Sequence, residues 1–165
     1  MMRDLRRFLW VLALALPTQA ASAQNQTLTV RNGDQVVTLS MADLAAMPAS
    51  RVASDDAGKG EYEGVALADL LARAGVTFGQ TLRGLRLATY LTATGADGYR
   101  VVIALPEIDP DFTRHPGALV AVRQNGKSLS PRDGPLQLVL PGDKRHARWV
   151  RTLTSLEVLA APASK

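Results

Sequence analysis

The sequence predicts an α+β fold, a single mixed domain built mostly from antiparallel strands. The 165 residues fit one globular domain, and 47% of them are hydrophobic, which supplies a sizeable core. Segments with strand character outnumber segments with helical periodicity, and the helical segments are short. Strands and helices do not alternate as they do in a parallel sheet, and no internal repeat is present.

Residues 1–23 have the three parts of a secretory signal peptide. Arginines come first, an apolar run from Phe8 to Leu16 follows, and the stretch ends in the small residues Ala21-Ser22-Ala23. The apolar run is shorter than the roughly 20 residues that span a bilayer. We therefore expect cleavage after Ala23, rather than an uncleaved anchor, and a periplasmic or secreted domain of residues 24–165 with no stable membrane span.

Two export routes fit this N-terminus. The pair Arg6-Arg7 before Phe8 resembles a twin-arginine signal, but Leu5 stands where that signal usually has Ser or Thr. The general secretory route is therefore the preferred expectation.

Charge and cysteine content exclude several classes of function. The net charge of +4 falls to +2 once residues 1–23 are removed, so a nucleic-acid partner is not expected. The chain has no cysteine, which excludes disulfides, a thiolate nucleophile, a zinc ribbon and any cysteine-to-metal bond from this chain.

The domain is expected to begin with a hairpin and a short helix. Asn32-Gly33 lies between two apolar runs and is typical of a two-residue type I′ turn. Ser40 and Asp43 have the spacing of a capping box, so a helix over 41–47 is predicted, ended by Pro48.

The next segments are predicted to be a loop and a second helix. Residues 49–63 are polar and contain glycine, which indicates an exposed loop. From Val65 to Ala74 apolar residues recur at helical spacing, and Gly75 is a natural end for that helix.

The rest of the chain is predicted to be strands joined by tight turns. Glycine-containing turns are expected at 95–98 and 124–127. The expected strands are 85–93, 99–104, 118–123, 136–140 and 154–159.

Common catalytic patterns are missing. The chain has no nucleophile elbow, no phosphate-binding P-loop and no zinc-protease helix, and it holds only two histidines. His115 is interpreted as an exposed loop residue, and Asp109 and Asp111 as turn residues around Pro110. A self-contained hydrolase is therefore not supported, because no nucleophile and base can be paired.

One loop concentrates positive charge after a strand that is expected to be buried. It holds Lys144, Arg145, His146, Arg148 and Trp149. Such residues could bind a phosphate through charge-assisted hydrogen bonds, and Trp149 could add an aromatic face. The alternatives are a solvated basic loop and a tryptophan that only packs in the core, and the spacing alone leaves both open.

Three segments carry a resemblance to the molybdopterin-binding domain of the sulfite-oxidase family. Residues 62–75, YEGVALADLLARAG, resemble its helix motif, and residues 118–136, ALVAVRQNGKSLSPRDGPL, resemble its NG-x-PL run leading to the VLPG of 139–142. The basic loop ending in Arg148-Trp149 is similar to the family's closing motif. The resemblance covers about residues 60–158 and is closest to small secreted members of the family.

The resemblance implies roles for particular residues. Arg148 and the cations of Lys144, Arg145 and His146 would approach the phosphate of the pterin cofactor, with Trp149 in the same motif. Tyr99, in Asp97-Gly98-Tyr99, falls where the family has an active-site tyrosine. Its alternative is a strand-edge tyrosine with the hydroxyl in water.

One departure from the family pattern bears on chemistry. The larger enzymes bind molybdenum through a cysteine upstream of the helix motif, whereas residues 48–63 are abbreviated here and contain no cysteine. This chain cannot make that bond, so oxygen transfer at a cysteine-ligated metal is not expected from it.

Two function classes follow from the resemblance. The first is a periplasmic domain that binds molybdopterin or the molybdenum cofactor within an oxidoreductase system. The second is a cofactor-free module on the same fold that senses a small anion or binds a periplasmic protein.

Overall fold

The computed structural model describes residues 26–54, 60–113 and 117–162, and in them the predicted α+β fold is confirmed. Two sheets contain the strands, and short helical segments connect them. His115 and the predicted signal peptide lie outside the described residues. Within the described ranges no helix has both the length and the apolar character needed to cross a membrane.

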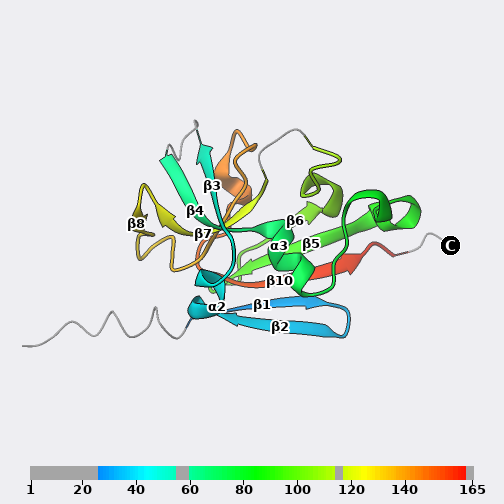
Figure 1. Cartoon of the computed structure of the whole chain (residues 1–165), viewed down its shortest axis with the longest axis horizontal. Helices are drawn as coiled ribbons and strands as arrows, with labels where there is room; N and C mark the ends of the chain where they lie inside the picture. The colour runs from blue at the N-terminus through cyan, green and yellow to red at the C-terminus, as the bar shows by residue number, and fades with distance from the viewer. Residues whose placement is uncertain (1–25, 55–59, 114–116, 163–165) are drawn as a thin grey trace, which may run out of the picture.

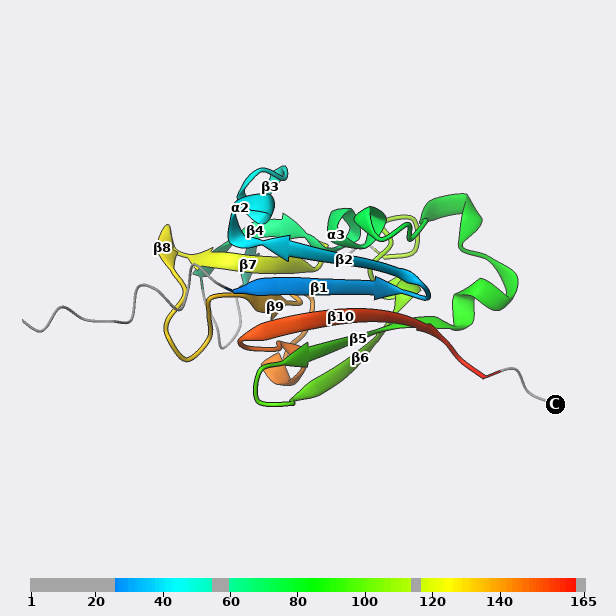
Figure 2. The same ribbon diagram turned by 90° about the horizontal axis from the view of Figure 1, so that it is seen from below.

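The first sheet has five strands, which Figure 2 shows side by side in the order β2-β1-β10-β5-β6. β1 and β10 are parallel, with Val30 opposite Leu156, and the other neighbours are antiparallel. The strand bounds are β1 Thr27–Asn32, β2 Gln35–Ser40, β5 Thr89–Gly95, β6 Arg100–Ala104 and β10 Leu153–Ala160.

The second sheet contains β3, β4, β7 and β8 in that order, with β9 paired to β7. All of these pairs are antiparallel. Figure 1 shows its strands gathered above the β1–β2 hairpin. The bounds are β3 Ala49–Ser54, β4 Gly60–Ala66, β7 Leu119–Gln124, β8 Lys127–Ser128 and β9 Gln137–Val139.

In the described residues, two α-helices and four 3₁₀ segments join the strands. Their bounds are α2 Met41–Ala45, α3 Leu67–Arg73, η1 Gly79–Thr81, η2 Gly84–Ala88, η3 Leu105–Glu107 and η4 His146–Arg148. The capping box of Ser40 and Asp43 is present at α2. The helix predicted from Val65 begins only at Leu67, because Val65 and Ala66 still pair with β7.

One continuous cluster of buried apolar side chains joins the two sheets. It contains Leu28 and Leu156 of the first sheet and Leu119 of the second, each 0% exposed. α3 contributes Leu67, Leu70 and Leu71 to the same core. Because both sheets share this core, the segments between β9 and β10 are held on a rigid support.

Two predicted segments have a different structure from the one expected. Residues 49–63 are not a loop, because β3 and most of β4 occupy the described part and pair with each other from Ala49↔Val65 to Ser54↔Gly60. Ion pairs from Arg51 to Glu61 and Glu63 link these strands. Polar cross-strand pairs of this kind replace the apolar alternation that usually marks a strand.

The second correction concerns the strand predicted over 85–93. Its first part, Gly84–Ala88, is a 3₁₀ helix, and β5 begins only at Thr89. Leu85 and Leu87 are exposed in η2, so their apolar character does not indicate burial here.

Candidate functional site

The basic loop of the sequence forms the connection from β9 to β10, with η4 at its centre. Backbone hydrogen bonds fix both of its ends: Asp143 N donates to Leu140 O at 3.0 Å, and Leu138 N donates to Val150 O at 2.9 Å. The end of the loop therefore lies beside β9, the strand from which the loop begins. This contact fixes the position of η4 relative to β9.

Trp149 anchors this loop in the core. It is 5% exposed, and its Nε1 donates to Leu140 O at 3.0 Å. The Tyr62 ring meets the indole edge-on with centroids 5.3 Å apart, and the His146 ring stacks on it at 3.6 Å. Trp149 is therefore packed in the core, and its role in binding a ligand stays a prediction.

Tyr99 reaches the same loop from the turn between β5 and β6. Its hydroxyl donates to Ala147 O at 2.5 Å, and its backbone N donates to Asp97 Oδ1 at 2.9 Å. The Tyr99 side chain is about half exposed. Its hydroxyl proton is used to tether η4, and its role as an active-site residue stays a prediction.

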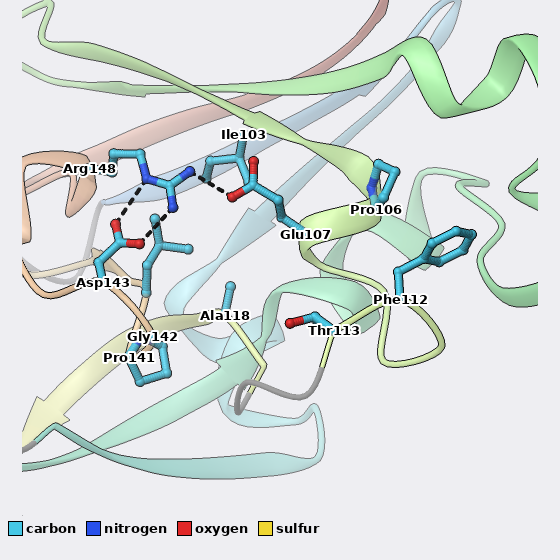
Figure 3. Close-up of a pocket in the computed structure, with 11 residues that line it drawn as sticks. Ile103, Pro106, Glu107, Phe112, Thr113, Ala118, Pro141, Gly142, Asp143 and Arg148 are labelled. Carbon is cyan, nitrogen blue, oxygen red and sulfur yellow. Dashed lines mark hydrogen bonds and ion pairs between the residues drawn. The ribbon is translucent and has the colours of Figure 1, made fainter.

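Arg148 is held by two carboxylates, those of Asp143 and Glu107, as Figure 3 shows. Its Nε and Nη2 donate to the two Asp143 oxygens at 2.9 and 2.6 Å, and its Nη1 donates to Glu107 Oε2 at 2.8 Å. These charge-assisted hydrogen bonds, first from Asp143 and then from Glu107, raise the pKa of Arg148 above its already high ordinary value.

A cavity of about 460 Å³ opens beside this ion-pair cluster. Ile103, Phe112 and Leu140 give it apolar walls, and its charged lining residues are Glu107, Asp143 and Arg148. Two carboxylates and one guanidinium leave this wall with a net negative charge. A phosphate entering here would have to displace carboxylates from Arg148, which is unfavourable.

The other cations of the loop are free to meet a ligand. Lys144 and Arg145 are exposed, and neither has an ion pair or a side-chain hydrogen bond with any residue that the structure describes. His146 follows them, and its Nε2 is buried with no hydrogen-bond partner in the described part of the chain. An orphaned buried nitrogen is uncommon, because it has given up water without replacement.

His146 also lines a second, smaller cavity of about 240 Å³ with Tyr99 and Trp149. Asp97, Ala147 and Arg151 complete its wall. Arg151 Nε pairs with Asp133 Oδ1 at 2.9 Å, so its charge is compensated. η4 therefore separates two cavities, with His146 facing one and Arg148 facing the other.

The sequence analysis identified the basic residues around η4 but missed the acidic partners of Arg148. Asp143 directly precedes Lys144 in the basic loop. It lies five residues before Arg148 and could have been recognised as a local ion-pair partner of that arginine. Glu107 lies 41 residues away on η3, and nothing in the sequence pattern links it to Arg148. The predicted turn residue Asp109 is buried and accepts from Gly79 N at 2.6 Å, which ties η1 to the segment after η3.

The described residues do not fit the metal centre that the family resemblance implies. The sequence supplies no thiolate, and the described ranges contain no group of three or more His, Asp or Glu side chains placed to hold a metal ion. The positive charge of Arg148 is already compensated by its ion pairs with Glu107 and Asp143. Lys144 and Arg145 are exposed cations of the kind that bind a small anion such as a phosphate group.

Comparison with known proteins gives one family match. A family model described as an oxidoreductase molybdopterin binding domain matches residues 51–165. No curated protein sequence matches the chain.

The fold is also found among solved structures. The crystal structure of the sulfane dehydrogenase SoxCD from Paracoccus pantotrophus is similar with a TM-score of 0.63 and 20% sequence identity. The similarity covers 88% of this chain but 40% of that one, so this chain spans well under half of its structural relative.

Proposed function

The chain belongs to the oxidoreductase molybdopterin-binding domain family, and from that premise we propose that it is an exported domain that binds a phosphate-bearing ligand at η4. In this proposal the chain holds no metal, because it has no cysteine and its described residues contain no group of three or more His, Asp or Glu side chains placed to hold one. The observation that carries the proposal is the exposed pair Lys144 and Arg145, whose side chains have no ion pair among the described residues, followed in sequence by the unpartnered Nε2 of His146.

These three residues would act by electrostatics and hydrogen bonding. Lys144 and Arg145 supply two full positive charges, and guanidinium and ammonium groups bind phosphate oxygens through charge-assisted hydrogen bonds. His146 would contribute its Nε2, which has no hydrogen-bond partner among the described residues. Trp149 and Tyr99 hold the loop in place through the core and through Ala147, so little ordering entropy is lost on binding.

Export is supported by the N-terminal pattern alone. The arginines, apolar run and Ala21-Ser22-Ala23 motif favour delivery to the periplasm or outside the cell. A role in an oxidoreductase system is suggested by the family, and the lack of a thiolate argues that any redox centre belongs to the bound ligand or to a partner.

A second candidate is a cofactor-free module that binds a periplasmic protein. The compensation of Arg148 by Asp143 and Glu107 favours it, because the family expectation for this residue is contact with a cofactor phosphate. In that case the exposed Lys144 and Arg145 would contact an acidic surface of the partner.

The first experiment measures what the protein carries. Protein purified from its native host is assayed for molybdenum by mass spectrometry and for pterin by fluorescence after oxidation. We expect molybdenum far below one atom per chain. Stoichiometric molybdenum would overturn the proposal that no metal is held.

The second experiment measures anion binding at η4. Pyrophosphate is titrated into the protein and into Lys144→Gln and Arg145→Gln. Each change is expected to weaken binding by about 1 kcal/mol, at the low end for charged hydrogen bonds because both side chains are exposed. Arg132→Gln, also exposed, is the matched control. Equal affinities for all four proteins would reject the anion site and leave the partner-binding module.

The variant His146→Gln gives an independent check on His146. It removes the imidazole whose Nε2 has no hydrogen-bond partner among the described residues, so pyrophosphate should bind more weakly while the protein remains folded. An unchanged pyrophosphate affinity in the folded variant would remove His146 from the site.

A further inference from the structure

A cavity of about 400 Å³ lies away from η4. Its lining comes from the β1–β2 turn, the residues after α3, η2 with the start of β5, η3 and the C-terminal end of β10. Figures 1 and 2 both show the β1–β2 turn and the C-terminal end of β10 toward the same end of the molecule. This cavity shares no lining residue with either cavity beside η4.

Its floor is apolar and well packed. Val76, Leu105 and Val158 line it and are 7%, 3% and 7% exposed, so they belong to the core and form a rigid surface. Leu159, at the rim, is 38% exposed. An apolar floor that is already in place favours a ligand with a hydrocarbon body.

The polar side of the cavity carries more positive than negative charge. Arg86 lines it, and Arg86 Nη2 donates to the neutral Thr77 Oγ1 at 2.8 Å. It has no carboxylate within ion-pair distance among the described residues. The second guanidinium, on Arg31, is 4.0 Å from Glu157 Oε1, which is the limit of an ion pair. Two arginines thus face one carboxylate.

We propose that this cavity binds a small amphipathic carboxylate. The acid group would lie against Arg86, with Arg31 nearby, and the hydrocarbon part would cover Val76, Leu105 and Val158. A cation would be repelled by the excess positive charge, and a neutral hydrocarbon would leave Arg86 without a counter-ion. The cavity volume falls within the range of about 300–1,000 Å³ that is usual for small-molecule sites.

The test uses octanoate as a probe, titrated calorimetrically into the purified protein. We expect saturable binding of one octanoate per chain, and at least about tenfold weaker binding of 1-octanol, which lacks the charge. Arg86→Gln should weaken octanoate binding about tenfold. Arg83→Gln, an exposed arginine three residues earlier that does not line the cavity, should stay within about twofold.

A second matched pair tests the apolar rim. Leu159→Asp places a negative charge at the cavity and should abolish octanoate binding, whereas Leu85→Asp, 92% exposed and outside the cavity, should not. Both positions are exposed, and a thermal unfolding curve checks that each variant is folded. If Leu159→Asp does not fold, the comparison of Arg86→Gln with Arg83→Gln decides whether octanoate binds in this cavity.

Three results would overturn the proposal. They are equal effects of Arg83→Gln and Arg86→Gln, octanol binding as tight as octanoate binding, and loss of octanoate binding in Arg145→Gln, which would place the ligand at η4. The last result would also leave the function proposed for η4 intact, so the two proposals fail separately.

Discussion

At the scale of single residues, the loop between β9 and β10 shows how one segment divides its charges. The Arg148 side chain donates hydrogen bonds to Asp143 and Glu107, and its bond to Glu107 links η4 to η3. Lys144 and Arg145, a few positions earlier, remain exposed. A run of cations in sequence is therefore two different groups in space, one structural and one free to bind.

This division predicts different results for neighbouring arginines. Arg148→Gln should lower the free energy of unfolding by about 1 kcal/mol, because Asp143 loses a bidentate partner while partial exposure limits the cost. Denaturant titration measures this loss, and the double variant with Asp143→Asn should lose less than the sum of the single variants. Strict additivity would mean that the pair contributes nothing.

The site could be predicted from sequence only in part, and the reason is visible in these residues. Basic residues adjacent in the chain mark a loop whatever the fold. Whether each cation is compensated depends on Glu107, which β-sheet packing brings from η3, 41 residues away. Long-range partners of this kind leave no local pattern, so the sequence could not separate Arg148 from Arg145.

At the scale of elements, local signals were reliable where backbone geometry requires a particular residue. Asn125 and Gly126 have φ of 51° and 74°, which is the conformation that Asn-Gly favours in a type I′ turn between β7 and β8. In the first hairpin the loop is Gly33-Asp34, one residue later than expected, and only Gly33 has positive φ. The hairpin is confirmed, while its I′ turn type is wrong.

Helix α3 gives a sharp prediction about the core. Leu70 is 0% exposed, so Leu70→Ala should cost about 2–5 kcal/mol through lost burial and the cavity that remains. Asp69→Ala, the exposed neighbour, should change stability by less than about 0.5 kcal/mol. Denaturant titration measures both effects. Similar losses of stability in the two variants would contradict the assignment of Leu70 to the buried face of α3.

The capping box of α2 predicts a pH effect. Ser40 Oγ and Ser40 N both donate to Asp43 Oδ2, at 2.6 and 2.8 Å, and these hydrogen bonds lower the pKa of Asp43. Because the folded-state pKa lies below the unfolded one, this stabilisation is present above about pH 4 and is lost as the pH falls further.

Unfolding of Asp43→Asn at several pH values measures this effect. The variant should be less stable than the parent near neutral pH, and the difference should shrink as the pH falls below about 4. Ser40→Ala, which removes the other half of the box, should cost about 1 kcal/mol at neutral pH. A difference for Asp43→Asn that is constant with pH would contradict the hydrogen-bonding pattern.

At the scale of the whole molecule, the first sheet depends on strands from both ends of the described chain. β1 lies between β2 and β10, so the first described strand pairs directly with the last. Leu28 and Val30 of β1 are 0% exposed in the shared core. Composition predicted the amount of core, but this parallel pairing of distant strands has no signature in the sequence.

This arrangement sets a limit on where an exported chain can be cut. β1 begins at Thr27, so cleavage after Ala23 removes no residue of the sheet, whereas cleavage beyond Leu28 would remove the buried Leu28 from the core. We predict that the exported protein begins at Gln24 and unfolds in a single cooperative transition. Intact-mass measurement of protein recovered from the periplasm or medium checks the start, and a mass that retains residues 1–23 in a membrane fraction would make the segment an anchor. A chain shortened to begin at Val30 is the control, because it loses Leu28 from the core and should fail to reach the stability of the chain that begins at Gln24.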